Sequence, residues 1–147
     1  MILRNLSNLI RALALAAVVA AAPAAWAFGP DDAGIFAVFD KQGKETDILY
    51  RFYIVKDKWV AEERAGDGSW RPFECKADCD ILPMSAADVT RVFGKGLELF
   101  NPLCLASSTF ALCSYTQKAN PALGGYLMMV NSPKGHVLLH IARIEKL

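Results

Sequence analysis

The pattern of apolar and polar positions after residue 33 is typical of a β-rich chain with one short helix. Runs of apolar, β-branched and aromatic residues alternate with polar segments that contain glycine, proline or aspartate. These runs predict strands at residues 34–40, 48–55, 58–64, 70–75, 108–116, 126–130 and 136–144. Residues 97–106 show no clear period, and Asn101-Pro102 interrupts them, so no regular element is expected there.

One segment, "SAADVTRVFG" at 85–94, carries the signals of a helix. Ser85 is a good N-cap residue, and Gly94 is a suitable residue for the end of a helix. Val89, Val92 and Phe93 follow the i, i+3, i+4 spacing and predict one apolar face. A helix of about two turns is too short to be stable alone, so packing must hold it.

These elements together predict an α+β domain. We expect a curled antiparallel sheet of six or seven strands, with the one short helix packed on it. A β-sandwich of two sheets is the alternative.

The first 27 residues have the three parts of a secretory signal peptide. Arg4 and Arg11 precede an unbroken apolar run at 12–22, and Ala25-Trp26-Ala27 forms a small-x-small cleavage site before Phe28. The run has 11 residues, whereas a spanning helix needs about 20, which argues against a retained anchor. The prediction is a cleaved leader at 1–27 and a single domain at 28–147, located in a bacterial periplasm or secreted.

Removal of the leader leaves a chain of nearly balanced charge. The whole sequence has 16 basic and 15 acidic residues, and the leader takes two arginines and no acid. The remaining chain has fourteen basic and 15 acidic residues. This balance gives no electrostatic reason to expect nucleic acid or an anionic membrane as partner. The rest of the chain has no apolar stretch of spanning length, so no stable membrane insertion is expected.

All four cysteines, Cys75, Cys79, Cys104 and Cys113, follow the leader. An even number in a small exported domain indicates disulfide bonds. Zinc is an alternative, because Cys75 and Cys79 meet the C-x(2–4)-C spacing, but no histidine lies near either pair. A thioredoxin-like redox pair needs two intervening residues and is disfavoured. The local pairings, Cys75–Cys79 and Cys104–Cys113, are favoured over the crossed ones.

No catalytic, cofactor-binding or metal-binding set is predicted. His136 and His140 are the only histidines, and they fall in a run typical of a strand. On a strand they share a face but lie about 13 Å apart, which is too far for one metal. The acidic residues mostly occupy turns, and no serine lies in a nucleophile-elbow pattern.

An aromatic group is the more interesting candidate for a binding site. Trp59, Trp70 and Phe73 come from neighbouring predicted strands, close to Arg64 and Arg71. If the tryptophans point outward, the five residues form an amphipathic patch of the kind that is enriched at interfaces. The alternative is ordinary core packing.

These features favour an exported, non-catalytic protein that captures another protein, such as an inhibitor or an immunity protein. A small envelope-acting hydrolase is one alternative, and it needs convergent polar groups in a pocket. A structural subunit of the cell envelope is another, and it predicts an exposed edge strand or a large apolar patch.

Overall fold

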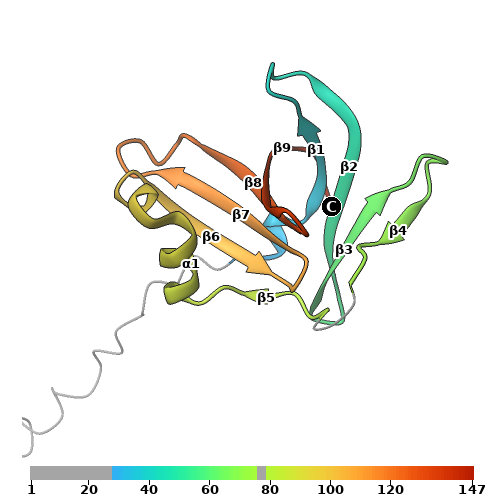
Figure 1. Cartoon of the computed structure of the whole chain (residues 1–147), viewed down its shortest axis with the longest axis horizontal. Helices are drawn as coiled ribbons and strands as arrows, with labels where there is room; N and C mark the ends of the chain where they lie inside the picture. The colour runs from blue at the N-terminus through green and yellow to red at the C-terminus, as the bar shows by residue number, and fades with distance from the viewer. Residues whose placement is uncertain (1–27, 76–78) are drawn as a thin grey trace, which may run out of the picture.

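The computed structural model describes residues 28–75 and 79–147, so the predicted leader at 1–27 lies outside the described residues. Nine strands form one antiparallel sheet in the order β4-β3-β2-β1-β9-β8-β7-β6-β5 (Figure 1). The strands are β1 Gly34–Phe39, β2 Glu45–Val55, β3 Lys58–Arg64, β4 Trp70–Pro72, β5 Leu82–Pro83, β6 Phe100–Ala106, β7 Phe110–Gln117, β8 Gly124–Ser132 and β9 Gly135–Lys146. The helical elements are η1 Pro30–Asp32, α1 Ala86–Phe93 and η2 Gly94–Glu98.

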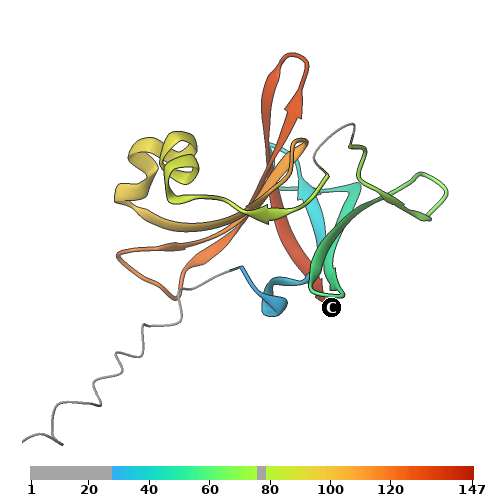
Figure 2. The ribbon, with the colours of Figure 1, turned by 90° about the horizontal axis from the view of Figure 1, so that it is seen from below.

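The twelve-residue strand β9 carries the sheet from one half of the molecule to the other. Residues 135–141 of β9 pair with β8, and residues 140–146 pair with β1. The first half therefore contains β1 to β4 and the second half contains β5 to β8, and they lie on the two sides of β9 (Figure 1). Figure 2 shows the same sheet from below, with the β8–β9 hairpin projecting beyond the rest of the molecule.

The core lies on one face of this curled sheet, which we call the inner face. Both halves contribute to it: Phe52 of β2 meets Phe110 of β7 with ring centroids 5.5 Å apart, and Phe36 of β1 meets Tyr126 of β8 at 5.0 Å. The buried core cluster consists of Phe28, Phe36, Val38, Tyr50, Phe52, Ala61, Leu105, Phe110, Leu112, Met128 and Ile141. A single sheet thus closes over its own side chains. The predicted class, a curled antiparallel sheet with one short helix, is confirmed.

The predicted number of six or seven strands is wrong, because β5 and β6 were not expected. Pro102 lies inside β6 although proline cannot donate to a ladder. The neighbouring strand β5 pairs only with Leu105 and Ala106, so β6 is open on one side at Pro102. A proline is tolerated in such an edge-like position.

The helix begins and ends where the sequence predicts. The Ser85 hydroxyl accepts a hydrogen bond from the Asp88 N–H at 3.1 Å, and Gly94 ends α1 with a φ of 48°. α1 lies beside β6 (Figure 1), yet none of its residues is buried. α1 therefore packs less closely on the sheet than the sequence predicts.

Two disulfide bonds join Cys75 to Cys79 and Cys104 to Cys113, as the local pairing predicts. Cys104 and Cys113 are directly opposite each other on β6 and β7 and are buried. Within the described residues, no helix is long and apolar enough to cross a membrane. The disulfide bonds are compatible with an exported protein.

Removing each disulfide separately should have unequal effects on stability. Cys104→Ala with Cys113→Ala should lower the free energy of unfolding by about 3 kcal/mol, since it frees the longer loop and empties buried volume. Cys75→Ala with Cys79→Ala should cost about 2 kcal/mol or less. Denaturant unfolding of both variants measures the difference, and a larger loss for the Cys75–Cys79 pair would contradict this order.

Phe28, the first residue after the predicted cleavage site, anchors the N-terminal end of the described residues in the core. It is 8% exposed and meets Trp59 edge-on at 5.4 Å. We expect Phe28→Ala to lower the free energy of unfolding of the 28–147 chain by about 3 kcal/mol. Ile48→Ala, at a side chain that is 48% exposed, is the control and should cost less than about 1 kcal/mol. Equal losses from both variants would show that Phe28 is not a core residue.

Candidate functional site

The five residues of the predicted aromatic patch do not lie on one surface. Trp59 and Arg64 are five positions apart on β3, so their side chains leave opposite faces of the sheet. Trp59 packs against the inner-face core. Phe73 does the same, and its ring centroid is 5.0 Å from that of Phe110. Two of the five residues therefore support the core.

Trp70 and Arg64 are paired across β3 and β4 on the other side of the sheet, which we call the outer face. The Arg51 guanidinium lies over the Trp70 ring, 4.6 Å from its centroid, and pairs with Glu62. The hydrogen bond to that carboxylate raises the pKa of Arg51. Arg71 is engaged with an aspartate of the preceding turn at 3.2 Å. Much of this surface is thus occupied by contacts within the chain.

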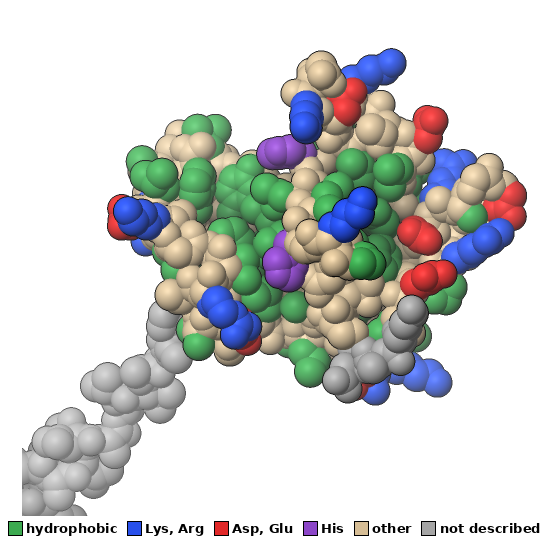
Figure 3. Space-filling view, in the orientation of Figure 1, with side chains coloured by type: hydrophobic (Ala, Val, Ile, Leu, Met, Phe, Trp, Pro, Cys, Tyr) green, Lys and Arg blue, Asp and Glu red, His purple; other side chains and the backbone are tan. Residues whose placement is uncertain are grey.

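A different surface, a groove on the outer face of the second half, is more open. Its volume is about 540 Å³, and it runs between α1 and the β8–β9 hairpin. Figure 3 shows it as green apolar surface beside the two purple histidine side chains. The groove is lined by Val92, Phe93, Gly96, Phe100, Tyr115, Gln117, Tyr126, Leu127, Met129, His136, Leu138 and His140. This volume lies in the range typical of ligand sites.

One wall of the groove is the apolar face of α1. Val92 and Phe93 line the groove, and Val92 is 41% exposed. The sequence period of this helix predicts that its apolar face is covered, but none of the helix residues is buried. The helix therefore presents apolar surface that the rest of the described chain does not fill.

The other wall is built by pleated strands. Met129 of β8 pairs with Leu138 of β9, and Leu127 pairs with His140, so all four side chains share the outer face. Leu138 is 54% exposed. The Cys104–Cys113 disulfide lies on the same face, because Cys113 pairs with Leu127, and it ties together the two strands next to this wall.

Glycine makes room for an aromatic lining residue. Gly125 pairs with Tyr115 on β7, and a Cβ atom at Gly125 would lie 3.0 Å from the Tyr115 hydroxyl. This is tighter than an ordinary contact, so a larger residue at this position would displace the Tyr115 ring. Gly125 therefore helps to set the shape of the groove.

The two histidines lie on the β9 wall and share one strand face, as predicted. His136 Nδ1 lies 2.6 Å from the Asn131 side-chain oxygen, so Nδ1 carries the proton and donates it. Within residues 28–75 and 79–147, no carboxylate is in salt-bridge range of either ring. No group of three or more metal-ligating side chains is found among the same residues.

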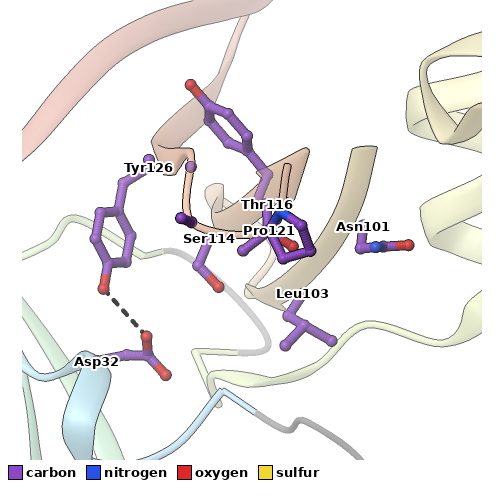
Figure 4. Close-up of a pocket in the computed structure, with 11 residues that line it drawn as sticks. Asp32, Asn101, Leu103, Ser114, Thr116, Pro121 and Tyr126 are labelled. Atoms are coloured by element: carbon purple, nitrogen blue, oxygen red, sulfur yellow. Dashed lines mark hydrogen bonds between the residues drawn. The ribbon is translucent and has the colours of Figure 1, made fainter. Parts of the chain in front are cut away.

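A second hollow of about 870 Å³ lies on the inner face (Figure 4). The Asp32 carboxylate accepts hydrogen bonds from the Gly29 N–H at 2.9 Å and the Tyr126 hydroxyl at 3.1 Å. Burial, followed by the charge of Asp32, raises the pKa of Tyr126. Ser114 and Thr116 add hydroxyl groups. This lining offers hydrogen bonds to a polar molecule, but none of its described residues is a histidine, lysine or cysteine.

No protein-family model matches the chain, and no curated protein or solved structure is significantly similar to it.

The groove was not predicted from the sequence, because its walls come from distant segments. The available signals were the apolar face of the 85–94 helix and the run "YLMMV", which is apolar at every position. A strand of this kind indicates that both of its faces are covered. Neither signal reveals that the two surfaces lie next to each other.

α1 is stabilised mainly by its two caps, so loss of the N-cap should lower the stability of this helix without unfolding the rest of the protein. Ser85→Ala should weaken the helix by about 1 kcal/mol. Hydrogen exchange of the α1 amides should then be about fivefold faster, while the global unfolding free energy changes little. Ser69→Ala, in a turn remote from α1, is the control. Unchanged exchange in α1 would contradict this account of how the wall is held.

Proposed function

We propose that this chain is an exported, non-catalytic binding protein that captures another protein through the groove between α1 and the β8–β9 hairpin. The observation that carries the proposal is the unburied apolar face of α1 opposite the exposed Leu138 of β9 and the half-buried Leu127 and Met129 of β8. Such surface is costly in water unless it serves an interaction. An apolar segment of a partner that lies in the groove would bury both walls at once.

Export is supported by the leader pattern at residues 1–27 and by the two disulfide bonds. The style of the leader favours a bacterial periplasm. In that compartment the buried Cys104–Cys113 bond is stable, and the sheet wall of the groove is preformed. A preformed wall lowers the entropy cost of binding.

The lining favours capture over catalysis. Most of the lining side chains are aliphatic or aromatic, and the polar groups are two histidines, a glutamine and the Tyr115 hydroxyl, since the Tyr126 hydroxyl bonds to Asp32 on the inner face. The described lining has no serine, threonine or cysteine that His136 could activate as a nucleophile. A groove of this composition suits a binding site with few polar contacts.

The sheet edges weigh against assembly by strand addition, which a structural subunit would use. The edge strands β4 and β5 have three and two residues, and each ends in a proline, Pro72 and Pro83. Short edges with proline offer few donors to an added strand. The exposed apolar surface is instead hollowed between two walls, which suits insertion of a segment.

A matched pair of variants tests the proposal. Leu138→Gln changes a groove side chain that is 54% exposed, and Ile48→Gln changes a side chain outside the groove that is 48% exposed. The 28–147 chain and both variants are used to capture a partner from periplasmic extract, and the affinity of the purified partner is then measured. We expect Leu138→Gln to weaken binding at least about tenfold, because anchors in apolar pockets carry most of the binding energy.

The control should bind like the unchanged protein, and all three proteins should have the same unfolding midpoint. A partner that binds the Leu138→Gln variant with full affinity would show that the groove is not the capture site.

A further inference from the structure

The charges of this protein are distributed unevenly along the chain. Between residues 28 and 85 the sequence has twelve acidic and eight basic residues. Between residues 86 and 140, which supply most of the groove, it has two acidic and four basic residues. The part of a nearly neutral protein that forms the groove is therefore locally basic.

The individual charges around the groove show the same bias. Arg91 on α1 is neutralised by Asp88 at 2.5 Å. Lys95 lies in η2, and the Lys118 N–H bonds to the Leu99 carbonyl at 2.9 Å, which places Lys118 beside the end of η2. Lys134 lies in the β8–β9 turn, two residues before His136. Glu98 is the one acidic residue in this part of the described chain without a salt bridge.

The histidines add charge inside this basic rim when they are protonated. Their cross-strand partners are uncharged: Asn131 and Leu127 on β8 pair with His136 and His140, and Phe39 on β1 pairs with His140. The nearest carboxylate on this face of β2 is that of Glu45, which pairs with Phe39 and is one strand further away. Across the groove, α1 supplies only Val92, Phe93 and no charge, and β6 and β7 supply Phe100, Tyr115 and Gln117. Tyr115 and Tyr126 are the other titratable groups of the lining. No carboxylate of the lining neutralises a protonated imidazole.

We infer that the segment captured in the groove is apolar and flanked by aspartate or glutamate side chains, which lie against His136, His140 and the lysines of the rim. The apolar residues bury the two walls, and the carboxylates complement the basic charge. This inference rests on the proposed function.

A random-peptide display selection against the 28–147 chain tests the inference without a known partner. Peptides that also bind the Leu138→Gln variant are removed, which leaves those that depend on the groove. The uncharged glutamine ensures that this step does not itself select for or against acidic peptides. We expect the remaining peptides to combine aromatic or aliphatic residues with aspartate or glutamate.

The selected peptide is then compared with a version that carries Asn and Gln in place of Asp and Glu. The acidic peptide should bind the unchanged protein roughly three- to tenfold more tightly than its uncharged version, as expected for two or three exposed charge contacts. In the double variant His136→Gln, His140→Gln, this preference for the acidic peptide should become clearly smaller.

The outcomes separate the inference from the proposed function. Groove-dependent peptides without enriched acidic residues, or a preference for the acidic peptide that is undiminished in the double histidine variant, would overturn the inference and leave capture by the groove intact. If no selected peptide depends on Leu138, the groove is not a capture site, and both proposals are contradicted.

Discussion

The pairing of β9 with both β8 and β1 is the constraint on which the rest of the structure depends. One continuous strand serves as the junction between two halves of a single sheet. Because the halves curl toward each other across β9, aromatic rings of β1 and β2 meet those of β7 and β8 on the inner face. The same strand presents His136, Leu138 and His140 on the outer face. The core and the groove therefore lie on opposite faces of the sheet at the same strand, β9.

The groove exists because the helix and the sheet are only loosely joined. α1 follows β5 and precedes β6, so the chain holds it at the side of β6, while its caps, Ser85 and Gly94, keep it helical. Its apolar face thus remains available. A small domain stabilised by disulfide bonds can leave such surface open, because part of its stability comes from covalent links rather than from core burial.

Local chemistry was readable from the sequence, and long-range pairing was not. Ser85 and Gly94 defined the helix because capping depends on neighbouring residues. The strand containing Pro102 was missed because its tolerance of proline depends on how little of it β5 covers. The residues of the predicted aromatic patch do not share one surface, because the pairing of Arg64 with Trp70 places Trp70 on the face opposite to Trp59. Prediction of the groove would have required the order of the strands in the sheet.

Hydrogen exchange of the protein with and without the partner that we propose it captures tests the central claim most directly. If the partner lies between α1 and the β8–β9 hairpin, the amides of residues 86–93 should become strongly protected, since this helix is held by few tertiary contacts when the groove is empty. Exchange in β2 and β3 should stay unchanged. Protection confined to β2 to β4, with none in α1, would contradict the account.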